Sequence, residues 1–216
     1  MHRRGVLASA ALVLFSAAAW AQGYPERPIT VIVPFAAGGP TDTVTRLIAE
    51  PMTSMLGQQV IVENVGGAGG TLGARRVANA DPDGYTLLLH HIGQATSASL
   101  YRKLAYDPAT AFAPIGLVTD VPMTVVGRSD LDPADAGQLI AWIKEKKDEV
   151  TYANAGVGSA SHLCGMLLMS ALEAPMTTVP YKGTGPAMTD LLGGQVDLMC
   201  DQTTNTTNQI RSGKIK

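Results

Sequence analysis

The sequence predicts an α/β fold, because strand-forming runs alternate with helical segments along the chain, the order typical of parallel sheets with crossover helices. In the first unit, the run ITVIV (29–33) leads into the glycine loop Ala36–Pro40 and a helix that begins near Thr41. A second unit repeats this order, with a strand at 150–154, a glycine-serine loop and an apolar helix at 160–172. The repetition indicates two lobes of similar construction.

Composition restricts the class of protein. A length of 216 residues fits one or two domains, and 46% hydrophobic residues are enough for a core. The 16 basic and 18 acidic residues give a formal charge of −2, and aromatic residues are only 5%. Nucleic-acid binding calls for a basic stripe, so we expect no nucleic-acid partner.

Residues 1–21 have the features of a secretory signal peptide. A basic start, MHRR, precedes an uncharged apolar run at 5–20 that is short for a membrane span, which needs roughly 20 residues. Ala19-Trp20-Ala21 fits a small-x-small cleavage site, so we expect cleavage after Ala21 and a periplasmic protein. An uncleaved N-terminal anchor is the alternative.

Export bears on the two cysteines, because exported proteins meet an oxidising compartment. Cys164 is expected early in a helix and Cys200 at the end of a strand. A disulfide between them and a pair of buried free thiols both remain open, since sequence does not fix the geometry.

Further elements are expected along both halves. One helix is predicted at 71–79. A second begins after Asp132, its N-cap, with Pro133 at the first helical position. A third begins at Pro186 and ends at Gly193-Gly194. A polar loop is expected at 90–96, and a hinge at 120–122 divides a first lobe, 22–118, from a second, 119–216. The end of the chain, 210–216, has the pattern of a helix end, a glycine stop and a new strand, which indicates a fragment. The remaining strands are expected at 60–63, 85–89, 115–118, 123–126, 177–181 and 196–200.

Five loops follow predicted strands, where ligands bind in open α/β sheets. They are rich in Gly, Ser, Thr and Asn and hold no lysine or arginine; Lys182 is the nearest cation. Helix N-termini attract anions through unpaired N–H groups and the helix dipole. We therefore expect an anion held by backbone amides, hydroxyls and water, although any one glycine loop is also explained as an ordinary turn. The loops are 34–42, 64–70, 90–96, 155–161 and 201–204.

Other chemistry is disfavoured. The glycines at 67–73 lack the acidic residue that completes a dinucleotide fingerprint, so no cofactor is expected. His90-His91, His162 and the cysteines lack metal-ligand spacing, so no metal is expected. A serine hydrolase using Ser159 or Ser161 remains a rival, although GSAS lacks the second glycine of a G-x-S-x-G elbow.

Several stretches together resemble the Bug-type receptors, the periplasmic substrate-binding proteins of tripartite tricarboxylate transporters. The resemblance covers essentially all of residues 24–216. These stretches are Tyr24–Ile29, Pro34–Asp42, Glu63–Gly70, Tyr101–Pro108, Phe112–Ile115 and Pro180–Gly183.

The resemblance implies a two-lobed type II periplasmic binding fold that clasps a small carboxylate and delivers it to membrane transporter subunits. It implies a non-enzymatic monomer without a cofactor, and a first lobe whose return strands are missing, so a non-functional receptor fragment is a further alternative. Gly38 and Gly158 are expected where a side chain would block backbone approach. The expected ligand-binding residues are Phe35, Ala36, Gly38, Gly39, Thr41, Asp42, Gly67, Ala68, Gly69, Gly70, His91, Asn154, Gly156, Gly158, Ser159, Ser161 and Asp201.

Overall fold

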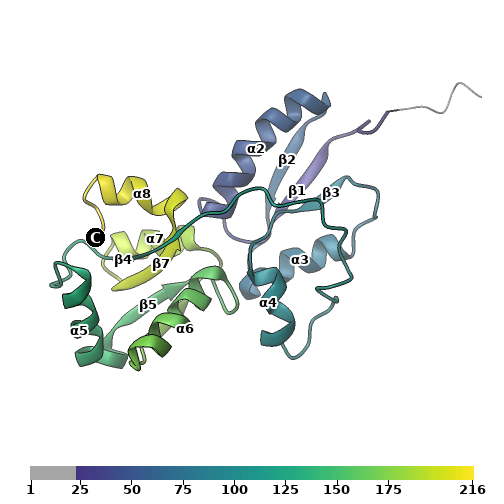
Figure 1. Ribbon diagram of the computed structural model, residues 1–216. Coiled ribbons are helices and arrows are strands. Elements are labelled where there is room, and N and C mark those ends of the chain that lie inside the picture. Colours follow the sequence, from purple (N-terminus) through teal and green to yellow (C-terminus); the bar gives the residue numbers. More distant parts are fainter. Residues whose placement is uncertain (1–22) are drawn as a thin grey trace, which may run out of the picture.

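A computed structural model describes residues 23–216, so the expected signal peptide lies outside the described residues. The chain forms two sheets in two lobes (Figure 1). The first-lobe sheet has the order β2-β1-β3 and is parallel throughout, as predicted. The second has the order β4-β7-β5-β6, in which β4 runs antiparallel to β7. The strands are β1 Ile29–Val33, β2 Val60–Asn64, β3 Thr86–Leu88, β4 Met123–Gly127, β5 Thr151–Asn154, β6 Thr177–Pro180 and β7 Leu198–Gln202.

Helices connect the parallel strands. The first, α2, ends at Gly57, which takes the left-handed conformation (φ 67°) that lets the chain leave the helix. Helix α6 has the bounds that its apolar pattern predicts. No helix within residues 23–216 is both long and apolar enough to cross a membrane. The helices are α2 Pro40–Leu56, α3 Thr71–Ala78, α4 Gly93–Leu100, α5 Ala136–Lys146, α6 Ala160–Leu172, α7 Thr184–Leu192 and α8 Thr203–Arg211, with short 3₁₀ turns η1 Ala68–Gly70 and η2 Lys147–Glu149.

The structure contradicts two predicted elements near the lobe connection. Residues 115–118 form no strand, because these β-forming residues have no partner strand. Ile115 is accordingly 85% exposed. Helix α5 begins at Ala136 rather than at Pro133, because Asp135, not Asp132, is its N-cap. The Asp135 carboxylate accepts a hydrogen bond from the Gln138 amide (2.8 Å), which satisfies a first-turn donor.

Two segments that were predicted as loops contain helix or strand in the structure. Residues 93–100 form helix α4, so the expected loop at 90–96 ends at Ile92. Asp201 lies inside β7, opposite Thr124, rather than in a loop after it, and α8 starts at Thr203. Both cavity-side segments are therefore more rigidly placed than their polar composition predicts.

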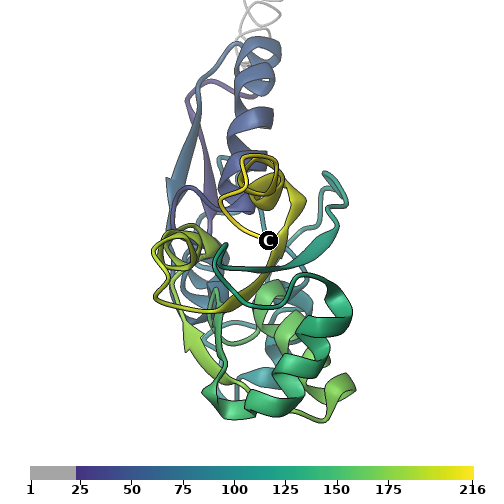
Figure 2. The same cartoon turned by 90° about the vertical axis from the view of Figure 1, so that its left-hand side faces the viewer.

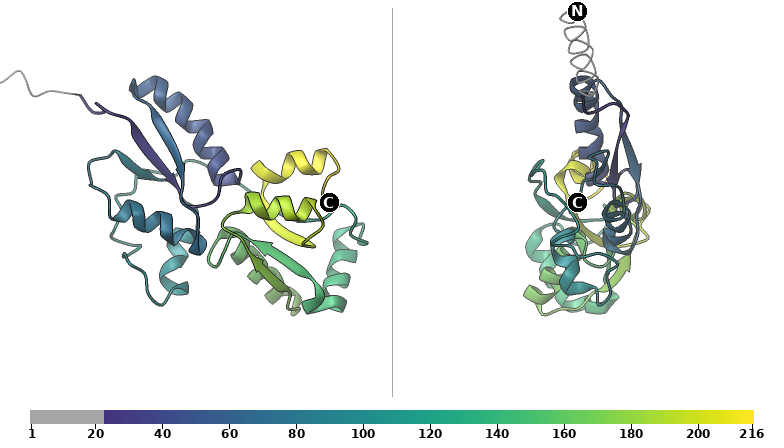
Figure 3. Two further views of the ribbon diagram at one scale, coloured as in Figure 1. Left: turned by 180° about the vertical axis from the view of Figure 1, so that it is seen from behind. Right: turned by 90° about the vertical axis from the view of Figure 1, so that its right-hand side faces the viewer.

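The two lobes are in contact. An extended segment crosses from the first lobe to β4 and contains the predicted boundary at 118/119 (Figure 1). Helix α2 contacts α8 where the lobes meet, as the end-on view shows (Figure 2). Seen from behind, the lobes join over a narrow region (Figure 3). The Tyr101 hydroxyl donates to the Val157 carbonyl (2.7 Å), and the Ala36 amide donates to the Lys182 carbonyl (2.9 Å).

The second-lobe sheet is covered on both faces. Successive residues of β7 point to opposite faces, with Met199 in one apolar cluster and Leu198 and Cys200 in the other. Cys200 forms a disulfide with Cys164 of α6, with their Cα atoms 6.2 Å apart. The question that the sequence leaves open is thus answered by a helix-to-sheet disulfide inside the core.

Reduction of this disulfide should lower the free energy of unfolding by about 4 kcal/mol, because it opens a loop with a sequence separation of 36 residues. Urea unfolding with and without reductant measures the change. The double variant Cys164→Ser/Cys200→Ser is the control and should not respond to reductant. An unshifted midpoint in reduced wild-type chain, with both thiols titratable, would contradict this role.

Candidate functional site

A small cavity lies between the lobes. Its volume is about 20 Å³, room for little more than one water molecule. In this arrangement of the lobes the cavity has no room for a larger solute. The lining residues come from both lobes and are Phe35, Gly39, Pro40, Thr41, His91, Met123, Ala155, Ala160, Ser161, Thr184, Asp201 and Gln202.

Four helices begin at this cavity. Gly39 to Thr41 open α2, Ala160 and Ser161 open α6, Thr184 opens α7, and Gln202 is the N-cap of α8. Each helix N-terminus carries roughly half a positive charge and N–H groups without intrahelical acceptors. No lysine or arginine is among the lining residues. Apart from the Asp201 carboxylate, the charges at this cavity are the partial positive charges of the helix N-termini, which favour a small anion.

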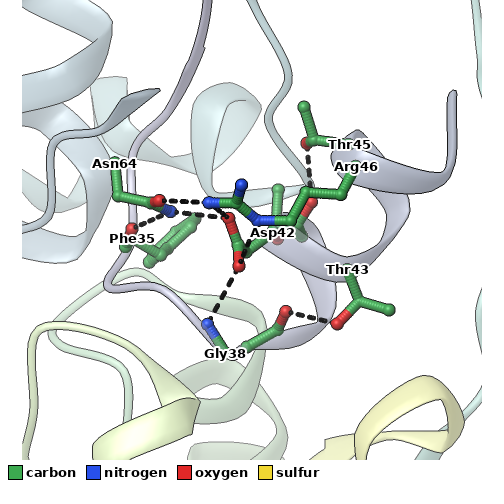
Figure 4. Close-up of polar contacts among 9 residues, drawn as sticks. Phe35, Gly38, Asp42, Thr43, Thr45, Arg46 and Asn64 are labelled. Atoms are coloured by element: carbon green, nitrogen blue, oxygen red, sulfur yellow. Dashed lines mark hydrogen bonds and ion pairs between the residues drawn. The ribbon is translucent and has the colours of Figure 1, made fainter. Parts of the chain in front are cut away.

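Asp42 holds the first loop in shape. Its carboxylate accepts hydrogen bonds from the Gly38 amide (3.0 Å), the Asn64 amide group (3.0 Å) and the Arg46 guanidinium (3.1 Å) (Figure 4). Burial raises the pKa of Asp42, but the hydrogen bonds from Arg46, Gly38 and Asn64 outweigh it, so the pKa is lowered. Asp42 does not line the cavity. Sequence reasoning missed Arg46, although its i,i+4 spacing from Asp42 predicts an ion pair.

The second loop is held by its own buried side chains. The Asn154 carboxamide oxygen accepts from the Gly156 amide (2.9 Å), and the Ser159 hydroxyl caps α6 by accepting from the His162 amide (3.2 Å). The Ser161 hydroxyl accepts from the Ala155 amide (2.9 Å) and also lines the cavity. These contacts close the loop around the start of α6.

The serine-hydrolase alternative lacks geometric support within residues 23–216. The nearest histidine, His162, uses its Nδ1 to accept from the Gly158 amide (3.3 Å) rather than from a hydroxyl. Ser159 and Ser161 contact each other through their hydroxyls (3.0 Å). No group of three or more metal-ligating side chains is found among the described residues.

The loop at 67–70 forms a contact between the lobes. A Cβ atom added at Gly69 would lie 1.8 Å from the Val157 carbonyl oxygen of the second lobe. A Cβ at Gly38 would meet nothing within 4 Å, and one at Gly158 would lie 3.2 Å from Leu100. The closest approach of another protein segment thus occurs at Gly69, and the space beside Gly38 holds no other protein atom within 4 Å.

The predicted site residues fall into three groups. One group lines the cavity. A second group lines a wider, more open space of about 750 Å³, which Lys182 and Tyr181 also line. A third group lines neither space. The cavity group is Phe35, Gly39, Thr41, His91, Ser161 and Asp201; the second group is Ala36, Ala68, Gly69 and Gly156; the third is Gly38, Asp42, Gly67, Gly70, Asn154, Gly158 and Ser159.

Six further residues line the cavity. Four of them lie within the loops predicted at 34–42, 155–161 and 201–204, whereas Thr184 and Met123 lie outside every predicted loop. Thr184 had a usable signal, since it follows Gly183 at the start of α7 as Thr41 follows the Gly38-Gly39 loop. Met123 had none, because its position depends on β4 pairing antiparallel to β7. The others are Pro40, Ala155, Ala160 and Gln202.

Two adjacent histidines pack against Phe35. The His91 ring stacks on it at 4.6 Å, and the His90 ring meets it edge-on at 5.5 Å. Burial lowers the pKa of His90 to about 3, assisted by the charge of His91, and lowers the pKa of His91 to about 4. Both rings are therefore neutral near pH 7.

Asp201 is the buried carboxylate of the cavity. Its side chain accepts from the Asn205 amide group (2.5 Å). Burial raises its pKa to about 6, although hydrogen bonds from Asn205, the Gln202 amide and Thr184 act in the opposite direction. Asp201 is thus mostly ionised at pH 7, within a cavity otherwise suited to anions.

The histidines predict an acid-sensitive fold. The free energy of unfolding should decrease as the pH falls from about 6.5 to 4, because the unfolded histidines take up protons that the folded ones reject. The slope is about 1.4 kcal/mol per pH unit for each histidine, and Asp201, which favours protonation when folded, offsets about one of the two below pH 6.

Urea unfolding at about pH 7 and about pH 5 measures this difference. The His90→Phe variant removes one titrating ring and should flatten the dependence by about one proton. The exposed Asp148→Asn variant is the control and should match the wild type. An unchanged slope in His90→Phe would contradict the assignment.

Known proteins resemble this chain over most of its length. Residues 44–216 match the family described as tripartite tricarboxylate transporter family receptor. The chain is 59% identical over 192 residues to the UPF0065 protein in the TAR-I ttuE-ttuC' intergenic region of Agrobacterium vitis; the match covers 89% of this chain and 56% of that protein.

Solved structures agree with these matches. The periplasmic binding protein BugD is 59% identical with a TM-score of 0.88, over 89% of this chain and 64% of that one. MatC from Rhodopseudomonas palustris, solved with bound malate, is 45% identical with a TM-score of 0.85, over 89% of this chain and 66% of that one. This chain therefore spans between about half and two thirds of the length of these proteins, and the predicted periplasmic binding fold is confirmed. The chain belongs to the receptor family of the tripartite tricarboxylate transporters, among the Bug-type periplasmic binding proteins.

Proposed function

We propose that this chain is the ligand-binding part of an extracytoplasmic receptor that holds a small carboxylate between its lobes and delivers it to the membrane subunits of a tripartite transporter. The observation that carries the proposal is the convergence of four helix N-termini on one cavity lined by residues of both lobes and by no cation. The malate bound to MatC supports a carboxylate as the ligand class.

Backbone amides would supply most of the hydrogen bonds to the ligand. A carboxylate at the start of α2 and α6 would accept hydrogen bonds from first-turn amides and from the hydroxyls of Thr41 and Ser161. A hydrogen bond to a charged group contributes about 1.5–3 kcal/mol, so three or four reach roughly the 8 kcal/mol of micromolar affinity after association costs. Closure of the lobes would exclude water and strengthen each bond.

The same proposal covers location and assembly. A disulfide in the core is typical of proteins that mature in an oxidising compartment, which supports the periplasm. We propose a monomeric, non-catalytic receptor, since the cavity gathers groups that bind an anion and no histidine ring within residues 23–216 is hydrogen-bonded to a serine hydroxyl.

Isothermal titration against mono-, di- and tricarboxylates tests the proposal. We expect micromolar affinity for at least one carboxylate, because the helix N-termini recognise the group itself. Matched uncharged amides are the controls and should give no heat. Folded chain that binds none of the carboxylates would refute the proposal.

Gly69→Ala should weaken carboxylate binding about ten-fold or more, because its Cβ would meet the Val157 carbonyl and keep the lobes apart. Gly38→Ala is the matched control: Gly38 also has a positive φ, 81° against 60° at Gly69, but has open space around its Cβ. Small-angle scattering should report a more open shape for Gly69→Ala only. Equal losses in both variants would show that backbone strain, rather than lobe contact, is responsible.

A further inference from the structure

Two titratable side chains line the cavity among groups that do not titrate. His91 comes from the first lobe and Asp201 from the second, and both line the cavity. The contacts of each side chain determine whether it donates or accepts a hydrogen bond in the cavity. Together they restrict which carboxylate fits.

His91 is fixed as a neutral donor. Its Nδ1 accepts a hydrogen bond from the Gly93 amide (3.0 Å), so the ring hydrogen of the neutral imidazole is on Nε2. Stacking on Phe35 holds the plane of the ring. His91 lines the cavity, and its ring therefore offers one N–H donor that carries no formal charge.

Asp201 is fixed as an acceptor. It is 2% exposed, and one carboxylate oxygen, Oδ2, accepts from Asn205. An ionised carboxylate only accepts hydrogen bonds. A ligand carboxylate placed against it would add like-charge repulsion in a poorly solvated space. A hydroxyl or ammonium group placed there would instead donate to it.

We infer that this cavity selects carboxylates that also carry a hydroxyl or ammonium donor, with His91 donating to a ligand carboxylate and Asp201 accepting from that donor. The inference rests on the proposed function and names its substrate class. It makes Asp201 a specificity-determining residue, while the helix N-termini supply affinity for any carboxylate.

The first test compares three four-carbon dicarboxylates by isothermal titration at about pH 7: succinate, L-malate and L-aspartate. The last two carry the hydroxyl and the ammonium donor. At least one of them should bind about ten-fold or more tightly than succinate, as expected for a hydrogen bond to a charged acceptor. Whichever of L-malate and L-aspartate binds more tightly than succinate identifies the donor that the site accepts.

The second test replaces the acceptor. Asp201→Asn keeps the side-chain volume but presents an amide, so the preference over succinate should fall to about two-fold or less. Asp190→Asn is the matched control, because Asp190 also accepts from a hydroxyl, that of Tyr181 (2.6 Å), but does not line the cavity. A loss of structure alone would weaken all three ligands equally and leave their ratio unchanged.

The third test replaces the donor. His91→Phe keeps an aromatic ring and should weaken all three ligands about ten-fold, and His91→Gln should restore most of the loss by supplying an amide N–H. His90→Phe is the control from the neighbouring ring, which does not line the cavity.

The outcomes separate the two proposals. Equal affinity for the three ligands, or an unchanged ratio in Asp201→Asn, overturns the selectivity and leaves the carboxylate receptor standing. Absence of binding to any carboxylate overturns both. Loss of preference in Asp201→Asn, together with a uniform loss in His91→Phe, supports the inference.

Discussion

The structure depends on a cavity between two lobes at which four helices begin and whose wall has no lysine or arginine. Backbone dipoles replace formal charge, and this requires several helices to start at one point. In a parallel sheet the carboxyl ends of the strands meet at one edge, so the following helices begin there. The α/β architecture of each lobe and the chemistry of the cavity are thus two aspects of one arrangement.

Such an arrangement needs loops that keep their shape while the lobes move. Asp42 binds the Gly38 amide and Asn64 in the first lobe, and Asn154 binds the Gly156 amide in the second. These polar side chains satisfy loop amides without entering the cavity. The residues that hold the loops in shape and the residues that line the cavity are therefore largely different sets.

This difference explains which features of the structure could be predicted from the sequence. Strand–loop–helix order depends on local patterns, so β1, α2 and α6 were predicted closely. The direction of a polar side chain in a loop depends on tertiary contacts, so the sequence did not predict that Asp42 and Ser159 accept hydrogen bonds from amides of their own segments. The position of Met123 depends on β4 pairing with β7, and the disulfide depends on α6 packing against β7 across 36 residues, so neither carries a local signal.

The position of the disulfide links maturation to the site. Cys200 directly precedes Asp201 in β7, and Cys164 lies three residues after Ser161 in α6, so the covalent bond ties two walls of the cavity at a set spacing. A chain still in a reducing cytoplasm has these walls joined by packing alone. Oxidation of the two thiols thus adds a covalent link that sets the spacing of two cavity walls.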